Sequence, residues 1–306
     1  MPQQIETNIL KEIEKSRTFR HRLASFNHLW FFRIYLNHYL TYKMAPFQRE
    51  MFKITEDESN QLTAVMAFRG SGKSTIMNLS FVLWSILGRL QKKFVIIISN
   101  NKNQSFLQLE NIYQELTGNE LLKKDFGPLI KETDQRTNRY LIIPKYNAKI
   151  MSITTKQSIR GLRSGQYRPD LIICDDIEDS SAPKNLREAI LIYNWFKNEI
   201  LSGLEPKTRI IVIGNLLHRD SFLTMIKDII SCKRINGIFC SYPIIDKNKN
   251  ILWPDKFKSL EDLHALEKSI GDKNIWKWEY ELTYPINLGE EARKRTKINI
   301  EDSKSD

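Results

Sequence analysis

The sequence contains little cysteine and no long apolar run. Its three cysteines, Cys174, Cys232 and Cys240, are scattered, and none belongs to a Cys-x-x-Cys pair or to a Cys/His spacing typical of zinc. A disulfide framework is therefore excluded, and a reducing compartment fits best. The N-terminus lacks the apolar core of a signal peptide, and no stretch approaches the roughly 18 apolar residues of a membrane span. We therefore expect a soluble, cytoplasmic protein with no membrane partner.

Glycine and proline are also sparse, at 12 and 10 of 306 residues, beside 41% hydrophobic and 27% charged residues. This composition argues against extensive disorder and is typical of one large globular domain or two modest ones. Acidic residues number 36 against 47 basic ones, which gives a net charge of +11. Such a surplus favours a polyanionic partner such as nucleic acid, because bound lysine and arginine release phosphate counterions. Basic charge kept for solubility explains the surplus equally well.

The apolar pattern predicts an α/β fold behind a helical N-terminal segment. Residues 5–43 should be helical, because apolar residues recur at spacings of three, four or seven, and Pro46 ends the region. From residue 62, short apolar runs alternate with amphipathic stretches, which predicts a mostly parallel sheet flanked by helices. The expected strands are 62–68, 93–99, 139–144, 148–155, 171–175 and 209–215, and the expected helices are 73–88, 103–117, 185–202 and 220–230.

The strongest motif is AFRGSGKST at residues 67–75, a Walker A loop between an expected strand and an expected helix. Gly70 and Gly72 would let backbone N–H groups turn toward the phosphates of ATP at the positive end of the helix. Lys73 would reach the β- and γ-phosphates, and the Ser74 hydroxyl would bind Mg²⁺. The loop departs from the usual pattern at its first position, where alanine replaces glycine. The predicted nucleotide-binding residues of the loop are Gly70, Ser71, Gly72, Lys73, Ser74 and Thr75.

A second motif, LIICDDIED at residues 171–179, supplies the acids that a Walker A loop requires. Its apolar residues predict a buried strand, and Asp175 at the strand end would hold Mg²⁺, usually through water. Asp176 is the first choice for activating the attacking water, and Glu178 is the reserve. Acidic clusters at strand ends are also common in turns. The accompanying Walker A loop favours the catalytic interpretation.

The spacing of these motifs indicates a RecA-like P-loop core. About 100 residues separate Lys73 from Asp175, which leaves room for two or three further strands. The strand expected at 209–215 ends at Gly214 and Asn215, where an amide beside the γ-phosphate could sense hydrolysis. An ordinary turn asparagine is an equal alternative.

Two weaker features accompany the motifs. Gln48 could read the edge of adenine while the ring of Phe47 stacks on the base, although a surface glutamine at a helix start is at least as plausible. The segment 156–170 is rich in basic residues, and guanidinium groups beside an ATP site can stabilise transition-state charge in cis or in trans. A solvated basic loop is the alternative. These residues are Lys156, Arg160, Arg163 and Arg168.

Taken together, the motifs resemble the large terminases of bacteriophages over roughly residues 30–287. The resemblance rests on RGSGKST (69–75), SIRGLRSGQYRPDLIICDDIED (158–179), IVIGNLLHRDS (211–221) and WKWEYELTYPI (276–286). It implies a motor that hydrolyses ATP with Mg²⁺ to drive double-stranded DNA into procapsids, in the cytoplasm of the host cell. The implied partners are further copies in a homo-oligomeric ring, a portal protein and a small terminase subunit. Arg69 matches a position proposed as an arginine finger, and Gly214 with Asn215 matches the coupling motif.

The family joins this ATPase to a C-terminal RNase H-like nuclease, and no strand with spaced aspartates follows Pro285. We therefore expect the nuclease on a separate domain or chain, and no DNA cleavage by this chain alone. The expected organisation is a helical segment at 1–45, a P-loop ATPase core at 46–232, a C-terminal part of the ATPase domain at 233–287 and a linker or tail at 288–306.

Two alternatives stay open at this point. A helicase would share the RecA-like core, but the about 90 residues after Asn215 leave no room for a second core. A nucleotide-gated DNA-binding or scaffold protein would bind ATP without turnover. The presence of Lys73, Ser74 and Asp175 argues against that alternative.

Overall fold

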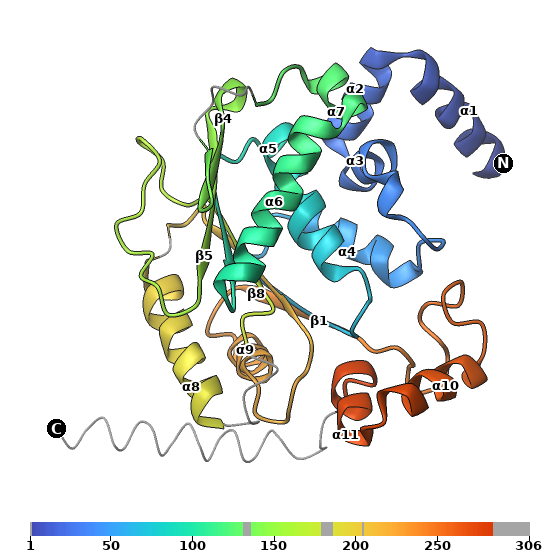
Figure 1. Ribbon diagram of the computed structural model, residues 1–306, viewed down its shortest axis with the longest axis vertical. Helices are drawn as coiled ribbons and strands as arrows, with labels where there is room; N and C mark the ends of the chain where they lie inside the picture. The colour runs from blue at the N-terminus through green and yellow to red at the C-terminus, as the bar shows by residue number, and fades with distance from the viewer. Residues whose placement is uncertain (1, 131–135, 179–185, 204, 284–306) are drawn as a thin grey trace.

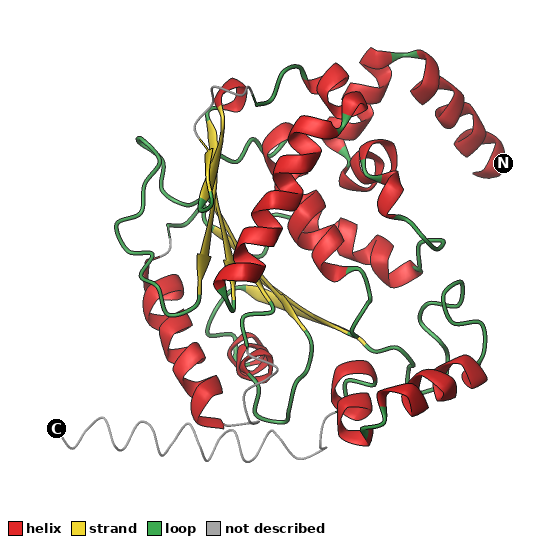
Figure 2. Cartoon of the chain, viewed as in Figure 1, coloured by secondary structure: helices red, strands yellow, loops and turns green. Residues whose placement is uncertain are grey.

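The computed structural model describes residues 2–130, 136–178, 186–203 and 205–283, which form one eight-stranded sheet covered by helices (Figures 1 and 2). The expected tail at 288–306 lies outside these residues. Strands β5, β2, β6, β7, β1 and β8 run parallel in that order, and β4 and β3 add an antiparallel hairpin at one edge. The strands are β1 (Leu62–Ala67), β2 (Phe94–Ser99), β3 (Arg136–Thr137), β4 (Tyr140–Ile143), β5 (Ala148–Thr154), β6 (Leu171–Asp175), β7 (Arg209–Gly214) and β8 (Gly237–Tyr242).

The central strands are the apolar runs that the sequence predicts. Every residue of β1, β2, β6 and β7 is buried, because helices cover both faces of the sheet. One apolar layer joins the sheet to the helices α3 to α6, and the other joins it to α8 and α9 (Figure 1). The mostly parallel α/β fold is therefore confirmed.

The expected helices are present in order, and α7, α10 and α11 are additional. They are α1 (Pro2–Lys15), α2 (Arg17–Phe26), α3 (His28–Tyr35), α4 (Pro46–Glu56), α5 (Phe81–Leu87), α6 (Lys102–Gly118), α7 (Glu120–Phe126), α8 (Leu186–Trp195), α9 (Phe222–Ser231), α10 (Leu260–Ile270) and α11 (Lys273–Ile275). π-Helical turns lie at η2 (Thr75–Ser80), η4 (Phe196–Ile200) and η6 (Trp276–Tyr280), and short 3₁₀ turns lie at η1 (Asn37–Tyr39), η3 (Pro144–Tyr146) and η5 (Leu201–Gly203).

The helical region expected at 5–43 is present, but it is divided into separate helices. Ser16 and Asn27 interrupt it, since each has an extended backbone and caps the helix that follows. The Ser16 hydroxyl accepts a hydrogen bond from the N–H of Phe19, and the Asn27 side chain accepts one from Trp30. Capping residues of this kind satisfy N–H groups that a helix start leaves open. The apolar spacing thus predicted the helical state, and the polar caps set the breaks.

Two buried polar contacts fix these helices to the core. Asp125, on α7, accepts hydrogen bonds from the Arg20 guanidinium at 2.5 and 2.8 Å and from the Tyr35 hydroxyl at 2.8 Å. His28 lies between Thr55 and Ser80, with ring nitrogens 2.6 and 2.9 Å from their hydroxyl oxygens. Complete burial lowers the pKa of His28 well below its usual value.

Strand β8 was not predicted. It pairs with β1 from Leu62↔Gly237 to Ala67↔Tyr242, so the sheet continues beyond residue 232. Only Tyr242 is fully buried along the strand, because β8 lies at the edge of the sheet. An edge strand carries a weaker apolar signal than a central one, which explains why the pattern missed it.

Candidate nucleotide site

The candidate site lies at the carboxyl edge of the sheet, where the ends of three strands meet. Strand β7 lies between β1 and β6, so the Walker A strand and the acidic strand are not neighbours. The register pairs Met66 with Gly214 and Asp175 with Ile213. Because parallel strands end at the same edge, this pairing brings the Walker A loop, the acids and Asn215 together.

The Walker A loop has the backbone that its glycines allow. Gly70 and Gly72 have φ values of 77° and 85°, a left-handed conformation that other residues rarely adopt. Ser74 is already helical, and the π-helical turn η2 begins at Thr75. Ala67, which replaces the usual first glycine, is the buried last residue of β1 and needs no such conformation. The departure from the motif is therefore compatible with the loop.

Lys73 is buried at the centre of the site. Its side chain is 7% exposed, and Nζ donates a hydrogen bond to Oδ1 of Asn215 at 2.5 Å. Oδ2 of Asp176 lies 3.9 Å from the same nitrogen. The structure therefore brings together three of the predicted residues, from the Walker A loop, the end of β6 and the end of β7.

Asp175 and Ser74 form the arrangement expected for a magnesium site. The Ser74 hydroxyl donates to Oδ1 of Asp175 at 3.0 Å, and the amides of Asn78 and Gln108 both donate to Oδ2 at 3.0 Å. Burial and the charge of Asp176 raise the pKa of Asp175 to about 7. Hydroxyl and carboxylate oxygens suit Mg²⁺, which usually takes one or two protein ligands and completes its shell with water and phosphate. The two residues therefore fit the cation.

The two candidates for water activation have different surroundings. Asp176 has a φ of 47°, unusual for a residue other than glycine, and its carboxylate is 36% exposed. Backbone strain of this kind is often found at functional sites. Glu178 is 10% exposed, and its Oε1 lies 3.6 Å from Nε2 of His218. Both acids line one cavity, so the choice between them stays a prediction.

That cavity has a volume of about 340 Å³ and lies beside the Lys73–Asn215 contact. Residues from the Walker A loop, the start of α6 and the ends of β6 and β7 surround it. They include Arg69, Asn100, Asn101, Gln104, Asp176, Glu178, Gly214 and Asn215. The cavity is thus lined by Arg69, both candidate acids and the side chain of Asn215.

Gln48 lies beneath the loop. It is 3% exposed, its Oε1 accepts the N–H of Ala45 at 2.9 Å, and its Nε2 donates to the Ser71 carbonyl at 2.8 Å. The ring of Phe47 is 5% exposed and packs against Phe68, among other aromatic rings. In this arrangement Gln48 links α4 to the Walker A loop. Recognition of adenine stays a prediction.

Arg69 makes a contact that the sequence did not predict. Its Nε lies 2.9 Å from Oε2 of Glu279 in η6, and its backbone N–H donates to the Glu279 carbonyl at 3.1 Å. Lys256 adds a second contact, since its Nζ donates to the Gly70 carbonyl at 2.9 Å. The residues missed by sequence reasoning are therefore Asn78, Gln108, Lys256 and Glu279. Glu279 lies within WKWEYELTYPI (276–286), but that motif did not indicate its contact with Arg69.

The basic residues of 156–170 pair elsewhere. Lys156 lies 2.8 Å from Glu188, Arg160 lies 3.4 Å from Glu199, and Arg168 lies 3.1 Å from Glu205. These acids belong to residues 188–205, beyond the acidic motif, and Arg163 is exposed. A catalytic role of Arg160 or Arg163 stays a prediction.

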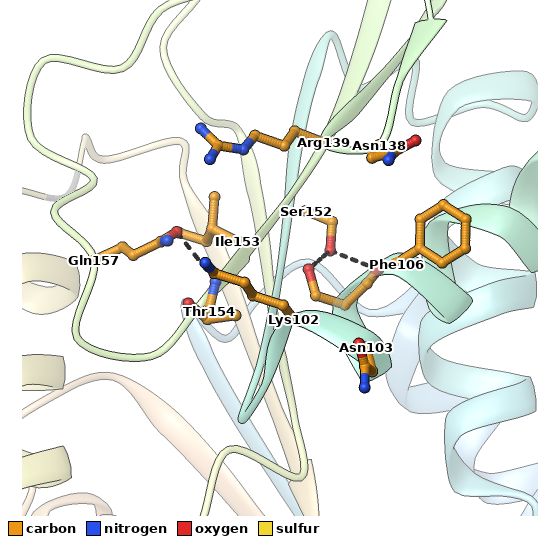
Figure 3. A pocket seen from close by; sticks show the side chains of 10 residues that line it. Lys102, Asn103, Phe106, Asn138, Arg139, Ser152, Ile153, Thr154 and Gln157 are labelled. Carbon is orange, nitrogen blue, oxygen red and sulfur yellow. Dashed lines mark hydrogen bonds between the residues drawn. The ribbon is translucent and has the colours of Figure 1, made fainter.

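A second pocket, of about 390 Å³, lies between the start of α6 and the end of β5 (Figure 3). Lys102 from α6 and Arg139 from the turn before β4 line it, with Phe106 and several amide and hydroxyl side chains. Its polar floor is formed by Ser105 and Ser152, whose hydroxyls bond to each other. The pocket is basic, with no acid among its lining residues.

Neither a family model nor a curated protein matches the sequence. The structure is similar to the HK97 bacteriophage large terminase, with a TM-score of 0.58 and 14% identity, over 79% of this chain and 51% of that one. It is also similar to a mutant ATPase domain of the Thermus phage P74-26 large terminase, with a TM-score of 0.51 and 13% identity, over 83% of this chain and 98% of that one. The chain thus spans about half of the HK97 protein and has the fold of these terminases.

Neither a membrane-spanning helix nor a metal-binding cluster of three or more His, Cys, Asp or Glu side chains occurs in the described part of the chain. A magnesium ion held by Ser74 and Asp175 with water and phosphate requires no such cluster.

Proposed function

We propose that this chain is a Mg²⁺-dependent ATP hydrolase and the motor domain of a phage large terminase, which drives double-stranded DNA into procapsids. The convergence of Lys73, Asn215, Asp175 and Asp176 at the edge of a RecA-like sheet carries this proposal. The terminase fold of the two similar structures supports the choice of motor.

The residues have separate roles in this mechanism. Lys73 would exchange its contact with Asn215 for the β- and γ-phosphates, because a phosphate oxygen is a stronger partner for a buried ammonium than a neutral amide. Ser74 and Asp175 would hold Mg²⁺, which supplies charge neutralisation to the phosphates when bound. Asp176 or Glu178 would orient the attacking water. Arg69 would stabilise the charge of the transferred phosphoryl group.

Phosphate release from ATP tests the hydrolase. Lys73→Ala should abolish turnover, since the loop loses the charge that neutralises the phosphates. Asp175→Asn should lose Mg²⁺-dependent turnover with a smaller loss of nucleotide binding. A matched control is Lys102→Ala, which removes a lysine from the second pocket and should leave turnover without DNA unchanged. Hydrolysis at the parent rate by either site variant would show that the site is wrongly assigned.

The proposed partners require a second measurement. Double-stranded DNA should bind weakly, without sequence preference and with strong salt dependence, because phosphate contacts alone would hold it. DNA, further copies in a ring, a portal protein and a small terminase subunit are the proposed partners. ATP binding without phosphate release, with or without DNA, would favour a nucleotide-gated binding protein instead. The absence of DNA cleavage by this chain alone stays a prediction.

A further inference from the structure

The Walker A loop contacts residues 243–280, which follow β8 and return to the loop. Glu279 accepts the backbone N–H of Arg69 with its carbonyl oxygen and lies 2.9 Å from the Arg69 Nε with its carboxylate. Lys256 of the same segment donates to the carbonyl of Gly70. This segment is therefore fixed to the loop at consecutive residues.

The two members of the ion pair differ in burial. The Glu279 side chain is 10% exposed, whereas the Arg69 side chain is 55% exposed. The carboxylate is therefore held by its surroundings, and the guanidinium lies at the end of a long, partly solvated chain. Separation of the pair leaves the buried carboxylate without this partner, so it costs at least the about fivefold limit of an exposed ion pair. Arg69 therefore leaves Glu279 only when a stronger anionic partner competes for it.

Arg69 also lines the cavity that Asp176, Glu178 and Asn215 line. In the proposed function the γ-phosphate lies at this side of the loop, so the guanidinium lies between two anionic partners. Its contact with Glu279 weakens when it stabilises charge on the transferred phosphoryl group, because the carboxylate and the phosphoryl oxygens compete for one guanidinium charge.

We propose that Glu279 is a positioning residue that holds Arg69 away from the phosphates until the transition state of ATP hydrolysis competes for it. This inference rests on the proposed function, with Arg69 as the arginine that acts on the phosphoryl group. Separation of the pair then adds to the barrier, so Glu279 lowers turnover in the resting protein. A movement of 243–280 that withdraws Glu279 would raise turnover, which links this segment to the active site.

The test is Glu279→Gln, measured by ATP turnover without DNA. The variant keeps the shape of the side chain and removes its charge, so kcat should rise about fivefold or more with KM unchanged. ADP with aluminium fluoride, which imitates the transition state, should bind more tightly by the same factor, and ADP alone should bind as before. Glu279→Asp should change kcat less than Glu279→Gln, since it keeps the charge but shortens the side chain.

Two comparisons make the result decisive. Glu281→Gln, two residues further along the chain, should have no effect, because the Glu281 carboxylate accepts a hydrogen bond from the Trp276 indole N–H and not from Arg69. In an Arg69→Ala background, Glu279→Gln should not change kcat. A lower kcat in Glu279→Gln with unchanged thermal stability, or a rise that persists without Arg69, would overturn the inference. If the parent protein does not hydrolyse ATP at all, the proposed function is refuted instead. The binding of ADP with aluminium fluoride separates this outcome from failure of the Glu279 inference.

Discussion

Replacement of Asn215 by alanine removes the oxygen that holds the Lys73 ammonium in the protein without nucleotide. The contact is 2.5 Å long, Lys73 is 6% exposed and Asn215 is 8% exposed. A hydrogen bond to a charged group stabilises a protein by about 1.5–3 kcal/mol. Asp176, at 3.9 Å, keeps part of the interaction. We therefore expect Asn215→Ala to lower the free energy of unfolding by about 1.5–2 kcal/mol.

The same change should strengthen nucleotide binding. In the nucleotide complex the phosphates, and not Asn215, hold the ammonium, so the lost hydrogen bond destabilises only the free protein. By linkage, Asn215→Ala should bind a non-hydrolysable ATP analogue about 10- to 30-fold more tightly. Its melting temperature without nucleotide should fall by about 3–8 °C, at about 2–4 °C per kcal/mol for a domain of this size.

Thermal unfolding with and without the ATP analogue, together with titration calorimetry, checks both expectations. Asn103→Ala on α6 is the control, because that asparagine is exposed and lies at the second pocket. An unchanged melting temperature without nucleotide would refute the structural role of the contact. A loss of affinity for the analogue would show that Asn215 contacts the phosphate in the complex, contrary to the exchange argued above.

Further predictions concern catalysis, stability and pH. Arg69→Ala should keep ATP affinity and lose about 10³- to 10⁵-fold in turnover. An equal loss of ATP binding would show that another arginine acts as the arginine finger. Arg20→Ala leaves the buried carboxylate of Asp125 with only the more distant, exposed Arg17, whose Nε lies 3.7 Å away, so urea unfolding should show a loss of up to about 3–5 kcal/mol. The double replacement Arg20→Met with Asp125→Leu should largely restore this stability. His28 stays neutral in the fold, whereas the unfolded chain takes up a proton below about pH 6.5. As the pH decreases below this value, the free energy of unfolding should therefore decrease by up to about 1.4 kcal/mol per pH unit more than in His28→Gln. Equal pH slopes in the two proteins would contradict this.

Most of the sheet and much of the candidate site could be predicted from the sequence. Buried parallel strands give continuous apolar runs, and Lys73 and Asp175 lie in motifs whose chemistry depends on residues next to them in the chain. The structure adds that β7 lies between their two strands, which places Asn215 against Lys73.

The remaining contacts could not be predicted, because they join residues far apart in the sequence. Glu279 meets Arg69 only after the chain has completed β8 and returned through α10 and α11. Gln108, on the first helix after β2, reaches Asp175 only because β2 and β6 are neighbours in the sheet. A glutamate or glutamine on a helix carries no local pattern that names its partner, so these roles depend on topology.

Gln48 shows how topology changes the interpretation of a single residue. Its amide donates to the Ser71 carbonyl, and the peptide bond is planar, so this contact also fixes the direction of the Gly72 N–H on the opposite side. Such N–H groups hold phosphates in a Walker A loop, which all nucleoside triphosphates share. We therefore expect Gln48→Ala to weaken the binding of ATP and GTP by the same factor, about 5- to 10-fold for one hydrogen bond of about 1 kcal/mol or slightly more. A residue that reads adenine would instead affect ATP alone. Competition titrations with the two nucleotides separate the cases. A loss of affinity confined to ATP would show that Gln48 recognises adenine.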